Sequence, residues 1–160
     1  MKSFLFLISL APIVCFSQAN CSDAGALLEL NSTVSSYQNK SFLLTDSKTV
    51  SLTADGNYTM TLDINSSFNY AFILSAPKGV KATGIEIDDA TGMQVQYDYK
   101  MTEGDNYIVA SDFKPDFDGV YKIIFKVVPQ SGSACAYIAV MKIDASEDTD
   151  EDDDAQKPKK

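Results

Sequence analysis

The segment NYTMTLDI, residues 57–64, alternates polar and apolar side chains with a period of two. Its apolar positions are Tyr58, Met60, Leu62 and Ile64. Successive side chains of a β-strand point to opposite faces, so this alternation predicts a strand with one face buried and the other solvated. The Asp55-Gly56 pair in front of the segment is a typical turn sequence and marks where the strand begins.

Similar alternation recurs over residues 85–88, 93–100 and 121–127, and each of these segments is predicted to be a strand. In the second of them, four side chains are predicted to face the core: Met93, Val95, Tyr97 and Tyr99. Two other runs, YAFIL at 70–74 and ACAYIAVM at 134–141, are apolar on both faces. Such runs predict central strands that are covered on both sides.

Residues 50–52 and 107–109 are further strand candidates, and short turn sequences that contain glycine separate the segments. About eight strands separated by such turns predict an all-β fold: a single antiparallel β-sandwich of jelly-roll type, over residues 42–144. Residues 20–41 are predicted to be an irregular or short helical segment. Ala24, Leu27 and Leu28 fit a short helix, whereas the Ser, Thr and Asn residues from Asn31 onward favour an irregular chain.

Residues 1–19 have the features of a secretory signal peptide: Lys2, an apolar run over 4–16, and small residues Ser17 and Ala19 before a predicted cleavage at Asn20. Cleavage after Ser17 is the alternative. The apolar run is too short to span a bilayer, and no later segment is long and apolar enough to do so. We therefore expect a secreted or periplasmic protein with no membrane span.

Residues 145–160 are dominated by aspartate, glutamate and lysine and are predicted to form a disordered acidic tail. The net charge of the whole chain is −9, and no cluster of basic residues offsets it. Nucleic acid is therefore not an expected partner, because contacts to phosphates require clustered positive charge.

The chain has three cysteines, and Cys15 lies in the predicted signal peptide. Cys21 and Cys135 remain as an even pair in an oxidising compartment, and we predict a disulfide between them. Two free thiols are the alternative. A bond that closes so long a loop stabilises the folded state by about 4 kcal/mol in the chain-entropy model.

The chain contains no histidine, no tryptophan and no arginine, since all 13 of its basic residues are lysines. The absence of histidine excludes Ser-His-Asp and Cys-His catalytic groups and the usual zinc and copper sites. The absence of arginine removes the usual bidentate group for phosphate or carboxylate substrates. We therefore expect a protein that is not an enzyme.

Carboxylates are the remaining catalytic class, and Glu86, Asp88 and Asp89 leave a small carboxylate-dependent hydrolase as an alternative. In the segment SDFKPDFDG, residues 111–119, three carboxylates precede a predicted strand: Asp112, Asp116 and Asp118. Calcium takes several oxygen ligands from flexible loops, so these residues are a candidate calcium site. Ordinary turn chemistry explains the same spacing, and no other cofactor is expected.

Aromatic side chains near predicted loops are the candidate ligand-binding residues: Tyr107, Phe113 and Phe117. The predicted function is a non-catalytic binding or accessory module for an extracellular protein or glycan, or a structural role at the cell surface. A secreted inhibitor or effector protein is a further alternative. An exposed aromatic or apolar patch favours a binding module, whereas a groove that brings two carboxylates together favours a hydrolase.

Residues 50–143 resemble the pre-peptidase C-terminal domain family of small secreted bacterial jelly-roll modules. The features that carry the resemblance are DGNYTMTLDI at 55–64, the aromatic strand at 70–74, and PDFDGVYKIIFKV at 115–127, which is similar to the Gly-x-Tyr strand of the family. The chain departs from the family at residues 68–72, where FNYAF replaces an Asp-Leu-Tyr strand. The resemblance implies a jelly-roll fold and a non-catalytic accessory or binding role, without the metal site.

Overall fold

The computed structural model describes residues 21–52, 56–77, 79–101, 107–129 and 132–146. The predicted signal peptide, residues 1–19, and all but the first two residues of the predicted tail lie outside the described part of the chain. Within that part, no helix is long and apolar enough to cross a membrane.

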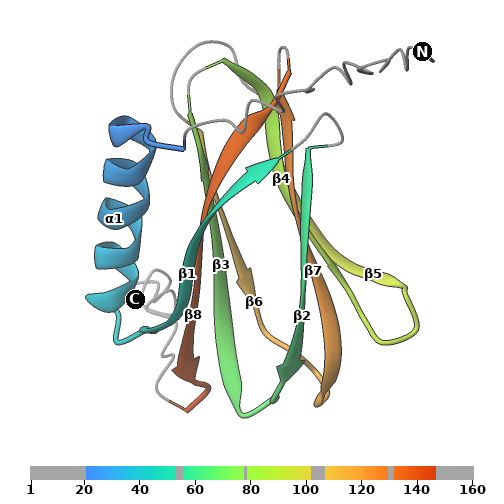
Figure 1. The fold of residues 1–160 in the computed structure, drawn as a ribbon. Coiled ribbons are helices and arrows are strands. Elements are labelled where there is room, and N and C mark those ends of the chain that lie inside the picture. Colours follow the sequence, from blue (N-terminus) through green and yellow to red (C-terminus); the bar gives the residue numbers. More distant parts are fainter. Residues whose placement is uncertain (1–20, 53–55, 78, 102–106, 130–131, 147–160) are drawn as a thin grey trace, which may run out of the picture.

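The described chain forms two antiparallel sheets of four strands and one helix (Figure 1). The first sheet, sheet A, has the order β1-β8-β3-β6, and the second, sheet B, has the order β2-β7-β4-β5. The elements are α1 (Ala24–Gln38), β1 (Leu43–Leu52), β2 (Asn57–Ile64), β3 (Phe68–Ala76), β4 (Val80–Asp88), β5 (Gln94–Met101), β6 (Tyr107–Phe113), β7 (Gly119–Pro129) and β8 (Ala134–Asp144). The two sheets face each other as a jelly-roll sandwich, so the predicted all-β fold is confirmed.

The main core lies between the two sheets, where the inner faces of their strands meet. Strand β2 lies at residues 57–64, as its alternation predicts, and Met60 and Ile64 are buried in this core. Aromatic rings connect the layers: Phe72 of β3 packs against Phe113, which packs against Tyr121 of β7. The period of two in residues 57–64 therefore correctly identifies a strand whose apolar side chains pack in the core between the sheets.

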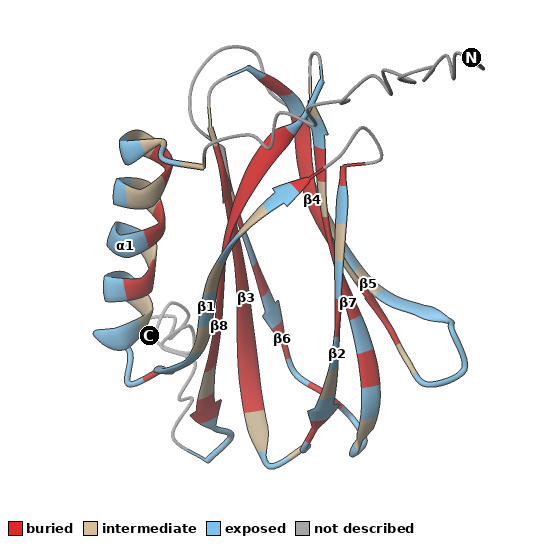
Figure 2. Ribbon diagram, in the orientation of Figure 1, coloured by how far each residue is buried: buried red, intermediate tan, exposed pale blue. Residues whose placement is uncertain are grey.

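The two central strands of sheet A, β3 and β8, are buried on both faces because helix α1 covers their outer side (Figure 2). Ala26, Leu30 and Val34 follow one another at intervals of four residues and form the buried stripe of the helix. They belong to a second apolar cluster with side chains of β3 and β8: Ala71, Ile73, Tyr137, Ala139, Met141 and Ile143. This second cover explains why β3 and β8 are apolar on both faces, as predicted.

Helix α1 is longer than its composition suggests, since it runs through Asn31 to Gln38 without interruption. The expectation of an irregular chain after Asn31 is therefore wrong. Its serines and threonines do not break the helix, and Ser35 donates its hydroxyl to the Asn31 carbonyl within it, at 2.8 Å. Asp23 caps the first turn by accepting the N–H of Ala26 at 2.8 Å. Burial of the apolar stripe outweighs the low helix propensity of the polar residues.

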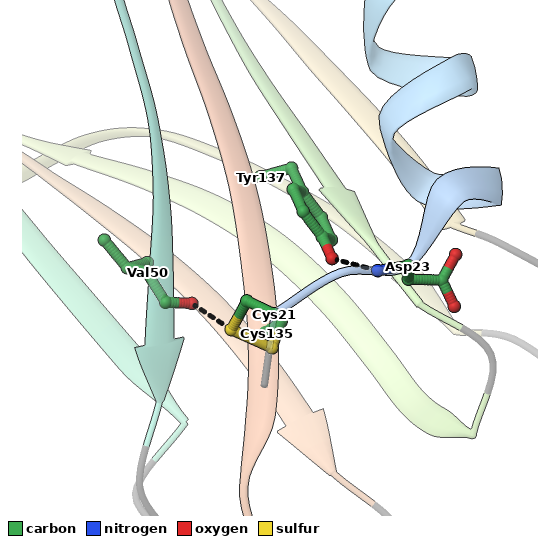
Figure 3. Close-up of a disulfide and its surroundings, with 5 residues drawn as sticks. All are labelled: Cys21, Asp23, Val50, Cys135 and Tyr137. Atoms are coloured by element: carbon green, nitrogen blue, oxygen red, sulfur yellow. Dashed lines mark hydrogen bonds between the residues drawn. A yellow bond between two sulfur atoms is a disulfide. The ribbon is translucent and has the colours of Figure 1, made fainter. Parts of the chain in front are cut away.

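A disulfide joins Cys21 to Cys135 of β8, which confirms the predicted pair (Figure 3). The two residues are 114 positions apart in sequence, and their Cα atoms are 5.6 Å apart. The Cys21 sulfur also lies 3.7 Å from the Val50 carbonyl oxygen of β1. Next to the bond, the N–H of Asp23 donates to the hydroxyl of the fully buried Tyr137 at 2.8 Å. The start of α1 is thus fixed to sheet A both covalently and by hydrogen bonding.

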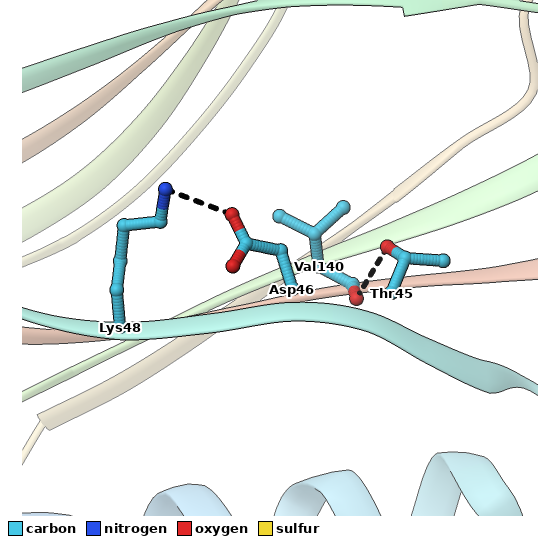
Figure 4. Close-up of polar contacts among 4 residues, drawn as sticks. All are labelled: Thr45, Asp46, Lys48 and Val140. Carbon is cyan, nitrogen blue, oxygen red and sulfur yellow. Dashed lines mark hydrogen bonds and ion pairs between the residues drawn. The ribbon is translucent and has the colours of Figure 1, made fainter.

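A bulge interrupts β1, the edge strand of sheet A, between Leu44 and Asp46. Figure 4 shows that the hydroxyl of Thr45, the extra residue, donates to the Val140 carbonyl oxygen at 2.9 Å, and that Asp46 pairs with Lys48 at 2.8 Å. Bulges and charged side chains on an edge strand discourage pairing with a strand of another molecule. This edge of the sandwich is therefore protected against sheet extension.

Replacing both Cys21 and Cys135 by alanine is expected to lower the free energy of unfolding by about 2–5 kcal/mol, because the unfolded chain gains the freedom that the bond removes. Urea denaturation followed by circular dichroism measures this difference. As a control, the reduced wild-type protein should unfold at the same urea concentration as the double variant. An unchanged midpoint would show that the bond contributes nothing to stability.

Candidate binding site

Strand β5, at the edge of sheet B, presents its aromatic side chains to solvent. Tyr97 lies opposite Glu86 of β4, and Tyr99 lies opposite Gly84. Residues directly opposite each other share a face of the sheet, and the neighbouring Ile85 points into the core. Tyr97 and Tyr99 therefore lie on the outer face, where they are 43% and 47% exposed. The prediction that the apolar and aromatic residues of 93–100 face the core is wrong, since Met93 and Val95 are exposed as well.

The inner side of β5 is polar and bonds to β6, the edge strand of sheet A. The side-chain nitrogen of Gln96 lies 2.8 Å from a carboxylate oxygen of Asp98, 2.8 Å from the hydroxyl of Ser111, and 3.0 Å from the Asp112 carbonyl oxygen. Ser111, which is buried, also donates its hydroxyl to Asp98. Gln96, Asp98 and Ser111 form what we call the β5–β6 hydrogen-bond cluster. Because the polar side chains of β5 find hydrogen-bonding partners inside the sandwich, the aromatic side chains of the strand point outward.

The two tyrosine rings lie close together and nearly parallel, with centroids 5.8 Å apart and planes inclined by 28°. We call this pair the tyrosine platform. Both rings lean over Gly84: a Cβ atom at this position would lie 3.1 Å from Cδ2 of Tyr99 and 3.5 Å from Cε2 of Tyr97. The glycine therefore leaves room for the rings to approach the backbone of β4, and the rings cover the backbone that the glycine leaves bare.

A charged pair flanks the platform on the adjacent strands. Lys126 of β7 forms an ion pair with Glu86 of β4, and its ammonium group lies 5.3 Å from the centroid of the Tyr97 ring. A cation at this distance is attracted to the ring by the negative potential of the aromatic face. The pair thus holds Tyr97 in place, and its two charges compensate each other.

The aromatic residues that the sequence singled out do not form this surface. Phe113 is 6% exposed and packs in the core, so the expectation that its ring is exposed is wrong. Phe117 is 75% exposed, but it lies in the loop between β6 and β7. Tyr107 begins β6, and its side chain lies outside the described part of the structure. Sequence reasoning placed Tyr97 and Tyr99 in the core because their strand has the same alternation as its buried neighbours.

The three candidate calcium ligands differ in their surroundings, and Asp112 and Asp118 bond to different residues. Asp112 accepts the hydroxyl of Tyr37 of α1 at 2.6 Å. Asp118 accepts the N–H and the hydroxyl of Ser66 at 2.6 Å each, while Asp116 is exposed in the same loop. In the described ranges, no group of three or more His, Cys, Asp or Glu side chains is placed to hold a metal ion. Calcium binding by Asp112, Asp116 and Asp118 stays a prediction.

Two of the carboxylates considered for hydrolysis, Glu86 and Asp89, already have partners. Glu86 is paired with Lys126, and Asp89 accepts hydrogen bonds from Thr91 and from the N–H of Met93 in the turn before β5. The hydroxyl of Thr91, followed by the N–H of Met93, lowers the pKa of Asp89 below its ordinary value. A general acid needs a raised pKa in order to hold its proton near neutral pH, so Asp89 does not fit that role.

The chain matches no protein-family model, and the comparison with curated proteins found no match. The resemblance to pre-peptidase C-terminal domains therefore holds for the jelly-roll fold and does not extend to membership of that family.

Several solved structures align with part of this chain. A CBM4 carbohydrate-binding module aligns with 69% of this chain and 83% of that chain, at 12% identity and a TM-score of 0.47. TmCBM61, solved in complex with β-1,4-galactotriose, aligns with 64% of this chain and 88% of that chain, at 12% identity and a TM-score of 0.42. The enzymatically active domain of tailspike protein 4 from bacteriophage CBA120 aligns with 64% of this chain and 19% of that chain, at 14% identity and a TM-score of 0.40. At TM-scores below 0.5, these similarities do not indicate a ligand or an activity for this chain.

Changing Ser111 to alanine is expected to loosen β5, because it removes the buried β6 hydroxyl that bonds to both Gln96 and Asp98. Loss of such a partner costs about 1–3 kcal/mol of folding free energy. Amide hydrogen exchange across β5 should become faster than in the wild type, while exchange in β3 and β8 changes less. Ser51→Ala, at an exposed position of β1, is the control and should leave both rates unchanged. Equal protection of β5 in S111A and wild type would contradict the role of the cluster.

Acidification should weaken the contact between the β2–β3 turn and the β6–β7 loop. Hydrogen bonds from the hydroxyl and N–H of Ser66 lower the pKa of Asp118 below its ordinary value of 3.8. A carboxylate with a lowered pKa in the folded state stabilises that state above its unfolded pKa, and this contribution is lost as the pH falls through the folded pKa. Denaturation measured between about pH 5 and about pH 2 should therefore show a smaller decrease for Asp118→Asn than for wild type. Asp116→Asn, in the same loop, should behave like wild type; equal slopes for all three proteins would disprove the coupling.

Proposed function

We propose that this protein is a non-catalytic carbohydrate-binding module that holds its ligand on the tyrosine platform of sheet B. The observation that carries the proposal is the outward orientation of Tyr97 and Tyr99, which the β5–β6 hydrogen-bond cluster supports from the other side of the strand. Large aromatic side chains that lie together on the surface of a soluble protein indicate an interaction site. Tyrosine suits such a site because it combines a rigid apolar ring with a hydroxyl group.

The chemistry of the platform fits a sugar ring. A pyranose has faces of C–H groups that pack on an aromatic ring, and a rim of hydroxyl groups that need hydrogen-bonding partners. Tyr97 and Tyr99 supply two nearly parallel rings, and their hydroxyls, with Lys126 and Glu86, supply donors and acceptors at the edge. The orientation of these groups is fixed before the ligand arrives, which lowers the entropy lost on binding.

The proposal is non-catalytic because the platform lacks an acid–base pair suited to bond cleavage. Glycoside hydrolysis requires two carboxyl groups on either side of the scissile bond, one of them protonated. Glu86, the carboxylate next to the rings, is paired with Lys126 instead. The absence of histidine from the chain removes the other common proton donor.

We further propose that the module works outside the cytoplasm, as a secreted or periplasmic protein. The Cys21–Cys135 bond supports this location, since disulfides form and persist mainly in oxidising compartments. The predicted signal peptide points to the same route of export.

A protein ligand is the second candidate, because the apolar surface continues beyond the tyrosines. Val95 and Met93 follow Tyr97 toward the β4–β5 turn, and both are exposed. A protein partner would cover this whole stripe, whereas a sugar needs only the rings and the polar groups beside them. Val95→Ser therefore distinguishes the two candidates: it weakens the binding of a protein and leaves the binding of a glycan nearly unchanged.

Tyr97→Ala and Tyr99→Ala are each expected to weaken glycan binding at least about tenfold, which corresponds to about 1.4 kcal/mol. A screen of immobilised neutral and charged polysaccharides identifies the ligand, and titration calorimetry measures the affinities. Phe117→Ala removes an exposed aromatic ring away from the platform and should bind like wild type. Undiminished binding by both tyrosine variants, with circular dichroism spectra unchanged, would refute the proposal.

A further inference from the structure

Two rows of side chains cross the outer face of sheet B from the tyrosine platform to the opposite edge. The strand register places Tyr99, Gly84, Lys126 and Asn57 in the first row. It places Tyr97, Glu86, Ile124 and Thr59 in the second row. Because residues in register share a face, the two rows together form one surface that crosses β5, β4, β7 and β2. Three gaps between strands, each about 4.8 Å wide, give it a length of about 14 Å.

The chemical character of this surface changes along the rows. The β5 end carries the two tyrosine rings, whereas the β2 end carries the amide of Asn57 and the hydroxyl of Thr59, both on exposed residues. Between these ends, Gly84 has no side chain and Ile124 is 9% exposed. No large exposed apolar side chain therefore separates the rings from the polar groups on β2.

A chain that ran along β5 would meet a different surface. It would leave the rings and pass over Val95 and Met93, which offer no side-chain hydrogen bonds for hydroxyl groups. A chain that crosses the strands meets stacking groups first and hydrogen-bonding groups next. The crossing direction thus satisfies both the C–H faces and the hydroxyls of a polysaccharide.

In these two rows and the row next to them, each charged side chain lies near one of opposite sign, which indicates the charge of the ligand. Lys126 is paired with Glu86, and in the adjacent row Lys122 lies opposite Asp88. An anionic polymer needs cations that are free to pair with it, and a cationic polymer needs free carboxylates. Rows built from one internal ion pair and neutral side chains suit an uncharged ligand.

We infer, on the basis of the proposed function, that the ligand is an uncharged, extended polysaccharide whose chain crosses sheet B from Tyr97 and Tyr99 to Asn57 and Thr59. The β2 end is then a second subsite that contacts the chain through hydrogen bonds. Ligands long enough to span about 14 Å engage both subsites, and shorter ones engage the platform alone.

The test measures affinity against chain length, using the neutral polysaccharide that binds best in the screen and size-fractionated oligomers made from it. The protein is produced in a bacterium, because Asn57-Tyr58-Thr59 is an acceptor sequence for N-glycosylation. Wild-type affinity should rise with length and then level off once both subsites are filled. The double variant Asn57→Ala, Thr59→Ala should lose about tenfold for the long oligomers and bind the shortest ones like wild type.

Thr61→Ala is the matched control, since Thr61 is an exposed threonine on the same face of β2, one row away. It should follow the wild-type curve at every length. If the double variant also follows that curve while Tyr97→Ala loses binding, the second subsite is disproved and the proposed function stands. Tighter binding to alginate, pectate or polylysine than to every neutral polymer would overturn the inferred ligand class. Binding that Tyr97→Ala and Tyr99→Ala leave intact would overturn the proposed function itself.

Discussion

The hydrogen bonds between β5 and β6 determine which surface of this protein meets the solvent. At this open edge of the sandwich, the inner side chains of β5 are polar and need hydrogen-bonding partners. Gln96 and Asp98 of β5 and Ser111 of β6 solve this locally by bonding to one another. Because the polar side of β5 forms its hydrogen bonds inside the sandwich, Tyr97 and Tyr99 point outward, and the exposed tyrosine platform follows from that.

The two sheets differ in how far their outer faces are covered by other elements. Helix α1 seals the outer face of sheet A, and the buried hydroxyl of Ser75 strengthens the seal by donating to the Ala26 carbonyl at 2.9 Å. Within the described chain, the outer face of sheet B has no such cover. In the described chain, the central strands of sheet A therefore pack on both faces, whereas sheet B packs through its inner face.

Much of the fold can be predicted from the sequence, because strand alternation and the apolar runs of β3 and β8 are strong signals. The disulfide is predictable too, since only two cysteines remain outside the predicted signal peptide. Periodicity shows that side chains alternate between two faces, but it does not show which face points inward. In β5 this choice depends on Ser111, a partner on another strand that no local pattern reveals. Phe113 is the reverse case: it stands next to a loop in sequence, yet its ring fills the space between Phe72 and Tyr121.

The position of α1 has a consequence for how the protein meets a large, immobile ligand. The described chain begins at Cys21, on the outer side of sheet A, and β8, its last strand, belongs to the same sheet. An attachment through either end therefore need not cover the outer face of sheet B, where the tyrosines lie. If that face binds a glycan as proposed, the molecule can be tethered at sheet A and still lie flat against an insoluble substrate.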